Sequence, residues 1–305
     1  EKITQFHMDI ASSIQKVTED VMIKLTKSLR SEYDIPNLCL AGGVALNCVA
    51  NGKILKEKIF KNIWVQPASG DAGGSLGATL ALWYESDNQR IVNPNDDMKG
   101  SYLGPEYSQD EIEKELKNIG AKFIVLNESD LLEKTVEQII NQSAIGWFQG
   151  RMEFGPRALG GRSILGDPRS TQMQKTLNLK VKYRESFRPF APSILENDLT
   201  EWFDIDSKSP YMLMVANVNE SKVIEMTKEQ KKLFGIEKLN IQRSEIPAVT
   251  HVDYSARIQT VSDQTNPRYY KLLEQFKKKT GCQFPSKRTV AFFQTHRDTL
   301  LYSVS

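Results

Sequence analysis

The chain has 305 residues, with 40 Lys or Arg against 38 Asp or Glu, so its formal net charge is only +2. That balance excludes a protein that coats nucleic acid, which needs a far larger basic excess. The four Trp, ten Tyr and thirteen Phe exclude an intrinsically disordered chain. No apolar run approaches the roughly 18 residues needed to cross a bilayer, so no membrane-spanning segment is expected. The length suits about two ordinary domains.

The start of the chain and its cysteines bear on origin and compartment. Residues 2–15 follow Glu1 and are typical of an amphipathic helix rather than a signal peptide, which indicates a piece of a longer protein. Cys39, Cys48 and Cys282 are odd in number and lack zinc-site spacing. We therefore expect reduced thiols, a buried Cys39 and a cytoplasmic protein. The three histidines are scattered and form no local metal cluster.

The first 85 residues predict alternating helices and strands. Apolar residues recur every three or four positions from Phe6 to Leu25, which predicts one long helix with a single buried face. We then expect a strand at 38–41, a Gly-Gly turn, a helix ending near 59, a strand at 62–66 and a small-residue helix at 72–84. This alternation predicts an α/β layer with parallel strands.

Residues 85–105 are polar and rich in turn formers, so we expect a linker and a domain boundary there. The elements predicted next are a helix at 108–118 that opens with a capping-box sequence, a strand at 122–126, a helix at 129–142 and a strand at 144–148. The remainder mixes Pro-rich turns with short alternating strands such as 247–261. The second half therefore predicts an α+β architecture.

A glycine turn forms the first candidate site. The apolar strand in LCLAGGVALN (38–47) runs directly into Gly42 and Gly43, and Asn47 follows one turn later. Backbone N–H groups without neighbouring side chains, together with the positive end of a following helix, would bind a phosphate or another anion. A tight turn from strand to helix without any ligand explains the pattern equally well.

A second turn, SGDAGGSLGA (69–78), places Asp71 just before a helix of small residues. The carboxylate is either a helix N-cap or a ligand to a cation that a nucleotide brings with it. A cap needs only the aspartate, so the surrounding glycines favour close approach by another group.

A strongly basic stretch runs from Arg151 to Arg188. It holds nine Lys or Arg against three acidic residues, whereas the rest of the chain carries a net charge of −4. The charges lie among glycines, prolines and aromatic residues, so we expect arginines that bind a compact phosphate-bearing substrate rather than nucleic acid. In 247–261, His251, Asp253, Arg257 and Gln259 alternate and would share one face of a hairpin, although a plain surface hairpin fits as well.

Six motifs resemble the nodulation-type O-carbamoyltransferases, a family that carbamoylates sugars and antibiotics. They lie at 9–15, 38–47, 67–78, 146–169, 182–195 and 248–261. The resemblance implies an α/β plus α+β fold. Residues 1–98 would be the C-terminal part of a transferase domain like the actin and sugar-kinase (ASKHA) fold, and 99–305 a YrdC-like domain that forms carbamoyl-adenylate, with an atypical tail at 283–305.

The resemblance also implies a reaction and its residues. In the family, carbamoyl phosphate and ATP, with Mg²⁺, give carbamoyl-adenylate and pyrophosphate, and the carbamoyl group then passes to a hydroxyl of a sugar or glycosylated natural product beside iron(II). Arg151, Lys182 and Arg188 would bind the phosphates, completed by His251 and Arg257; Gly42, Gly43 and Asn47 would hold the adenylate; Asp71 would bind iron. No nucleic-acid or membrane partner is implied, and the oligomeric state and acceptor stay open.

Two departures from the family limit these expectations. The H-x-x-x-H pair of the family's iron site is absent, so we expect this chain to bind no iron at Asp71 and to transfer nothing on its own. After Cys282 the sequence matches no family motif, and we hypothesise a frame-shifted or otherwise altered tail. Two alternatives therefore remain, a sugar-kinase-like phosphotransferase and a non-catalytic nucleotide-binding remnant.

Overall fold

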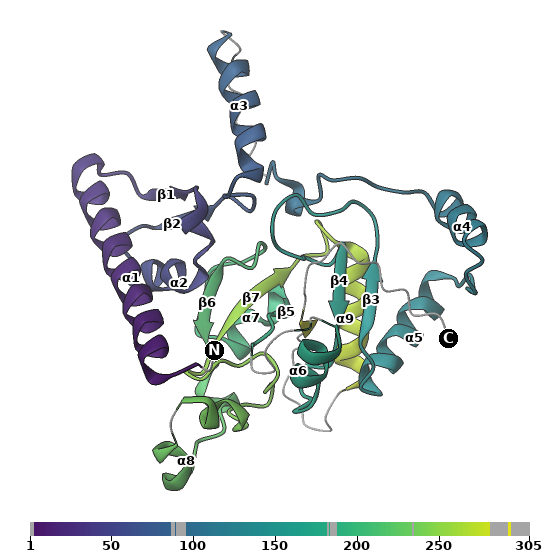
Figure 1. Cartoon of the computed structure of the whole chain (residues 1–305). Coiled ribbons are helices and arrows are strands. Elements are labelled where there is room, and N and C mark those ends of the chain that lie inside the picture. The colour runs from purple at the N-terminus through teal and green to yellow at the C-terminus, as the bar shows by residue number, and fades with distance from the viewer. Residues whose placement is uncertain are drawn as a thin grey trace.

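The computed structural model describes residues 3–86, 89, 96–181, 183, 188–233, 235–280 and 292–293. Its helices are α1 (Gln5–Tyr33), α2 (Cys48–Lys56), α3 (Ala72–Glu85), α4 (Gln109–Asn118), α5 (Glu128–Ile140), α6 (Met173–Thr176), α7 (Leu199–Trp202), α8 (Lys228–Lys232) and α9 (Pro267–Lys279). Its strands are β1 (Asn37–Leu40), β2 (Asn62–Val65), β3 (Ile145–Phe148), β4 (Arg162–Leu165), β5 (Pro192–Leu195), β6 (Met214–Asn217), β7 (Ser255–Val261) and β8 (Phe292–Phe293). Small sheets and surrounding helices make a mixed α/β fold (Figure 1). None of the described helices is long and apolar enough to span a membrane.

Helix α1 confirms the predicted long helix but corrects the prediction of a buried apolar face. Phe6 is 68% exposed and Val17 is 61% exposed, and the rest of the predicted stripe is exposed as well. The helix instead packs on α2 through a different face, where Glu19 is buried and forms an ion pair with Lys53. Helical periodicity shows which side chains share a face, but not which face another element covers.

Strands β1 and β2 pair in parallel, from Asn37 opposite Asn62 to Leu40 opposite Val65, which confirms the predicted pairing. The predicted burial of Cys39 is wrong, because its side chain is exposed. Successive residues of a strand point to opposite faces, so the face that buries Leu38 turns Cys39 outward.

The helix predicted directly after the Gly-Gly turn begins later than expected. Residues Gly43–Leu46 form a single 3-10 turn, and α2 starts only at Cys48. Asn47 is therefore the N-cap of α2 rather than a residue one turn inside it. The open backbone at Gly42 does not lie at the end of an α-helix dipole, which corrects that part of the sequence argument.

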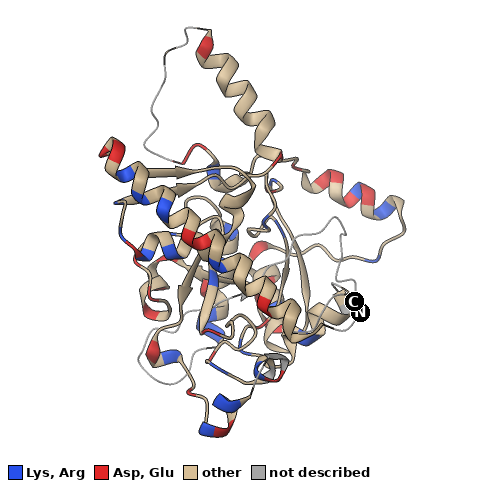
Figure 2. Ribbon diagram, turned by 60° about the vertical axis from the view of Figure 1, so that its left-hand side comes forward, with Lys and Arg blue, Asp and Glu red and all other residues tan. Residues whose placement is uncertain are grey.

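Helix α3 confirms the predicted small-residue helix, but it lies apart from the body of the protein (Figure 1). It has no buried residue, and Leu82 is 67% exposed. Figure 2 shows it almost without charged residues between its two ends. Helices α1 and α3 therefore both carry apolar surface that the described residues leave uncovered.

The segment predicted as a linker is partly built into the fold. Residues 87–88 and 90–95 lie outside the described residues, but Met98 and Ser101 are buried, and the Tyr211 hydroxyl donates to Asp96. The strand predicted at 122–126 is wrong, since these residues adopt no regular structure and Ile124 is 67% exposed. Apolar content alone does not make a strand when no partner strand lies beside it.

The second half is organised around a sheet in the order β6-β7-β5-β8. Strand β7 pairs antiparallel with β6 and parallel with β5. The hairpin predicted within 247–261 is wrong, because residues 251–254 form a turn and only β7 is a strand. The helix at 108–118, its capping box at Ser108, the helix at 129–142 and the strand at 144–148 are confirmed by α4, α5 and β3.

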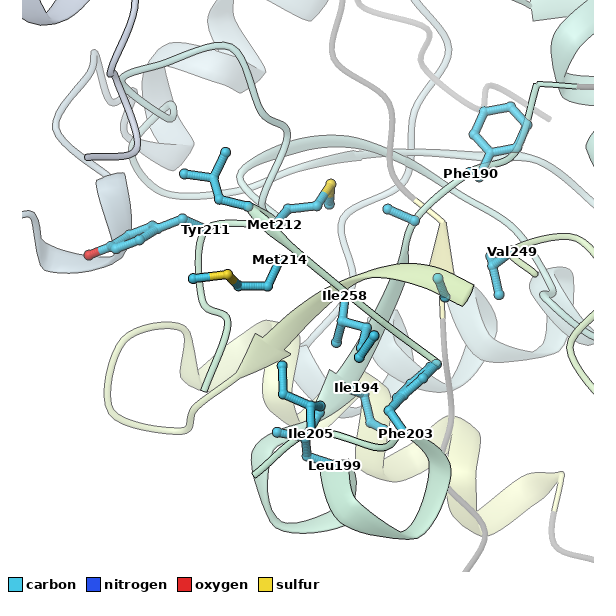
Figure 3. Close-up of a cluster of buried hydrophobic side chains, with 14 of the residues drawn as sticks. Phe190, Ile194, Leu199, Phe203, Ile205, Tyr211, Met212, Met214, Val249 and Ile258 are labelled. Carbon is cyan, nitrogen blue, oxygen red and sulfur yellow. The ribbon is translucent and has the colours of Figure 1, made fainter. Parts of the chain in front are cut away.

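One apolar core joins the two halves of the chain. Ala45 and Val65 belong to the same buried cluster as Phe203, Met214 and Ile258, and Figure 3 shows the second-half members of this cluster gathered around β7. At the junction, a Cβ added to Gly52 of α2 would lie 2.2 Å from the Val215 carbonyl oxygen. The backbones of α2 and β6 therefore lie in direct contact, with no room for a side chain at Gly52. The domain boundary at 98–99 stays a prediction.

Candidate functional site

The loops that follow β1 and β2 lie at one edge of their sheet, since parallel strands point their carboxyl ends the same way. Gly42 has φ +90°, and apart from its chain neighbours no described residue has an atom within 4 Å of the Cβ position of Gly42 or of Gly43. The turn therefore has open space around its backbone, as predicted. Whether it holds an adenylate stays a prediction.

The side chain of Asn47 already has partners. Its amide oxygen accepts a hydrogen bond from the Ala50 N–H at 3.1 Å, and its amide nitrogen donates to Gln15 Oε1 at 2.9 Å. These bonds cap α2 and join it to α1. A ligand that uses the Asn47 amide must share it or replace the Gln15 contact.

Asp71 is the N-cap residue of α3 and is exposed, with no cap hydrogen bond from its side chain. Among the described residues, no group of three or more His, Cys, Asp and Glu side chains is placed to hold a metal ion. A lone exposed carboxylate does not fit an iron(II) site, which needs several ligands.

The loop between β3 and β4, residues 149–161, is organised by a buried glutamate. The Glu153 carboxylate accepts hydrogen bonds from the backbone N–H groups of Leu159 at 2.6 Å, Gly161 at 2.8 Å and Arg162 at 3.1 Å. Its side chain is almost fully buried. Because several main-chain donors converge on one carboxylate, the shape of the loop depends on this side chain.

Several cations of the basic stretch serve the fold. The Arg162 guanidinium lies 3.5 Å from the centre of the Phe148 ring and donates to the carbonyl oxygens of Gln149 and Gly150. Arg169 pairs with the buried Asp167. The expectation that arginines of the basic stretch need ligand anions is therefore wrong for Arg162 and Arg169, because protein groups already accept their hydrogen bonds.

Of the three predicted phosphate-binding residues, two lie within the described part of the chain and one does not. Arg151 is exposed, with Nε 3.5 Å from a Glu106 carboxylate oxygen and Nη1 donating to the Gly104 carbonyl at 3.1 Å. Arg188 is exposed, and its carbonyl accepts a hydrogen bond from Asn178 at 2.9 Å. Lys182 lies outside the described residues. Whether these three residues and Arg257 converge on one cleft stays open.

His251 is buried, and its charge state is influenced by Asp253, Arg257 and Arg243. Burial lowers the pKa of His251 to about 4, with smaller contributions from Asp253, which opposes the shift, and from Arg257 and Arg243, which favour it. His251 Nδ1 lies 3.1 Å from Ser255 Oγ, which donates to Asp253 at 2.6 Å. The imidazole is therefore neutral at pH 7.

Gln259, two residues along β7 from Arg257, contacts the 149–161 loop. On β7, Arg257 and Gln259 are two residues apart and share one face of the sheet. Gln259 donates to the Leu159 carbonyl at 2.9 Å, so the loop covers that face. The expected shared face thus holds for this pair, whereas His251 and Asp253 reach the same region from a turn.

Arg157, one of the nine cations of the basic stretch, and Ser69 are polar residues to which the sequence assigns no individual role. Arg157 Nη2 donates to the Leu46 carbonyl at 3.1 Å, which links the second half of the chain to the Gly-Gly turn. Ser69 lies in the loop after β2 and is only 6% exposed. No local sequence signal separates Arg157 from the other arginines of the basic stretch.

Two family models match this chain in order, the Carbamoyltransferase N-terminus over residues 1–80 and the Carbamoyltransferase C-terminus over residues 136–285. The chain belongs to the carbamoyltransferase family. The six motifs that resemble nodulation-type enzymes thus agree with an independent comparison.

The curated relatives extend beyond this chain. An uncharacterized protein of Synechocystis sp. is 57% identical over 92% of the chain and 46% of its own length. The nodulation protein NolO of Bradyrhizobium diazoefficiens is 39% identical over 91% of the chain and 47% of its own length. The nodulation protein NolNO of Sinorhizobium fredii is 40% identical over 91% of the chain and 38% of its own length. The chain therefore spans about half the length of the curated relatives it matches, or less.

Proposed function

We propose that this chain is the adenylate-forming part of an ATP-dependent O-carbamoyltransferase, with the end of its transferase domain attached. The observation that carries the proposal is the match of both carbamoyltransferase models in order, at 1–80 and 136–285. The neutral, buried His251 supports it, because its charge state is influenced by Arg257, and a guanidinium near a neutral imidazole suits phosphate binding.

The formation of carbamoyl-adenylate requires two chemical steps. Carbamoyl phosphate is first hydrolysed by one water to carbamate and inorganic phosphate. A carbamate oxygen then attacks the α-phosphorus of ATP, and the bond to the β-phosphate oxygen breaks as pyrophosphate leaves. Mg²⁺ would accompany the ATP and neutralise the leaving pyrophosphate. A later transfer passes the carbamoyl group to a hydroxyl of a sugar-containing acceptor and releases AMP.

This chain's residues would act in the first stage by electrostatic stabilisation. Arg151, Lys182, Arg188 and Arg257 would neutralise charge that builds on the phosphates as the α-phosphorus is attacked. His251, neutral at pH 7 because burial lowers its pKa, would donate or accept a hydrogen bond without repelling the neighbouring Arg257.

The test is carbamoyl-phosphate-dependent exchange of labelled pyrophosphate into ATP by the 305-residue chain. We expect exchange that needs carbamoyl phosphate and that falls at least tenfold in Arg257→Gln, about the loss of one charged phosphate contact. A matched control is Arg268→Gln, which removes an exposed arginine of α9 that pairs with Glu128. Exchange without carbamoyl phosphate, or none at all with ATP still bound, would favour the phosphotransferase or the nucleotide-binding remnant.

A further inference from the structure

Residues 99–105, called the strap from here on, run beside the 149–161 loop in the opposite direction. Three backbone hydrogen bonds join the two segments, from the N–H of Gly104 to the Met152 carbonyl at 2.9 Å, from the N–H of Met152 to the Pro105 carbonyl at 2.9 Å, and from the N–H of Phe154 to the Ser101 carbonyl at 2.7 Å. Because main-chain bonds fix the path of a backbone, the strap helps to set the path of the loop that carries Arg151.

The strap begins with strained backbone. Lys99, Gly100 and Ser101 have φ values of +49°, +69° and +70°, all in the left-handed region. For Lys99 and Ser101, which carry a Cβ, this conformation is costly and persists only where the surroundings fix it. Ser101 is buried, and its Oγ donates to the Phe154 carbonyl at 2.5 Å. The strained conformation is therefore held by contacts with the 149–161 loop.

The Tyr102 hydroxyl joins the strap to both ends of the loop. It donates to the Leu159 carbonyl at 2.6 Å and accepts a hydrogen bond from Asn266 Nδ2 at 2.8 Å. Asn266 is the N-cap of α9, and its Oδ1 accepts a hydrogen bond from Gln149 at the start of the loop. Burial raises the pKa of Tyr102, so the hydroxyl stays protonated and keeps its donor.

The strap also contacts the side chain of Arg151. Nη1 of this arginine donates to the Gly104 carbonyl at 3.1 Å, and Nε lies 3.5 Å from a carboxylate oxygen of Glu106, the residue directly after the strap. These contacts fix the direction of the guanidinium before a ligand arrives. A side chain that is already ordered loses less conformational entropy when it binds.

We propose that Tyr102 and Ser101 are positioning residues, which hold Arg151 in the direction needed to bind the phosphate groups of the substrates. This inference rests on the proposed function for the ligand of Arg151. Both positioning residues lie between the two ranges that the family models match, 1–80 and 136–285. Phosphate binding by the basic stretch thus depends on residues next to the predicted domain boundary.

The experiment titrates the 305-residue chain with inorganic pyrophosphate by calorimetry. We expect Tyr102→Phe, which removes the hydroxyl and keeps the ring, to weaken binding about fivefold. Ser101→Gly, which keeps the left-handed backbone and removes the Oγ contact, should weaken it severalfold. The matched control is Tyr107→Phe, which removes a hydroxyl from a tyrosine that is 53% exposed and should leave binding unchanged.

A double-mutant cycle tests whether the hydroxyl acts through the arginine. In an Arg151→Gln background, we expect Tyr102→Phe to change the affinity for pyrophosphate by less than about twofold. An equal loss of affinity with and without Arg151 would overturn the inference, since the hydroxyl would then act by another route. A parent chain that binds pyrophosphate no better than its Arg151→Gln variant would overturn it as well.

The alternative is a tyrosine that only stabilises the fold. In that case Tyr102→Phe would lower the melting temperature and leave the affinity for pyrophosphate as in the parent chain, which would also refute the positioning role. Pyrophosphate exchange into ATP without any effect of Tyr102→Phe on pyrophosphate binding would refute the inference and leave the proposed function. Binding that depends on Tyr102 and Arg151, in a chain without exchange, would do the reverse.

Discussion

Replacing Glu153 is expected to disorder the 149–161 loop, which carries Arg151 and Arg157. The carboxylate accepts three backbone N–H groups, those of Leu159, Gly161 and Arg162, within a buried site. Glu153→Ala leaves these donors without an acceptor. Each buried orphan donor costs about 1–3 kcal/mol. Partial access of water to the relaxed loop offsets some of this, so we expect the free energy of unfolding to fall by about 3 kcal/mol.

Glu153→Gln separates charge from shape. The glutamine keeps one acceptor oxygen but turns an NH₂ group toward a backbone donor, so about half of the loss is expected. Urea unfolding measures both variants, and pyrophosphate exchange measures whether the loop still positions Arg151. The matched control is Glu106→Gln, an exposed carboxylate next to Arg151, which should change stability by less than about 0.5 kcal/mol. A Glu153→Ala variant as stable as the control would refute the role of the carboxylate in shaping the loop.

Three further outcomes are expected. In the folded chain the pKa of His251 is about 4, below its ordinary value of 6.5, so the unfolded chain binds the extra proton. The free energy of unfolding therefore falls by about 3 kcal/mol as the pH drops from 6.5 to 4. Urea unfolding of His251→Asn should lack this pH dependence of stability, and an unchanged pH dependence would contradict the expectation. Gly52→Ala should lower the free energy of unfolding by more than about 2 kcal/mol, since the added Cβ would lie 2.2 Å from the Val215 carbonyl oxygen. Gly74→Ala, where the Cβ position has open space around it, should cause no such loss. Equal melting curves for the two variants would count against the close contact. Val17→Lys on the exposed stripe of α1 should change stability by less than about 0.5 kcal/mol and reduce self-association in light scattering, and a large loss of stability would show that the stripe is covered.

The sequence by itself determined most of the local structure. Helices α1, α3, α4 and α5 follow from periodicity and capping residues, because these signals act within a few residues of the chain. The parallel pairing of β1 and β2 followed from the alternation of strands with helices. The family followed from motifs whose residue types and order are independent of any coordinate.

Only the tertiary structure decided what those elements cover and which charges are already satisfied. The apolar face of α1 is exposed because α2 packs on a different face, and periodicity holds no information about the neighbour. Arg162 and Arg157 look alike in the sequence, five residues apart among glycines and apolar residues. Arg162 donates to carbonyls of its own loop, whereas Arg157 donates to the carbonyl of Leu46, 111 residues earlier. The buried Nε of Arg157 has no hydrogen-bond partner among the described residues. Hydrogen bonds between distant segments depend on the packed chain, so the difference between the two arginines emerges only there.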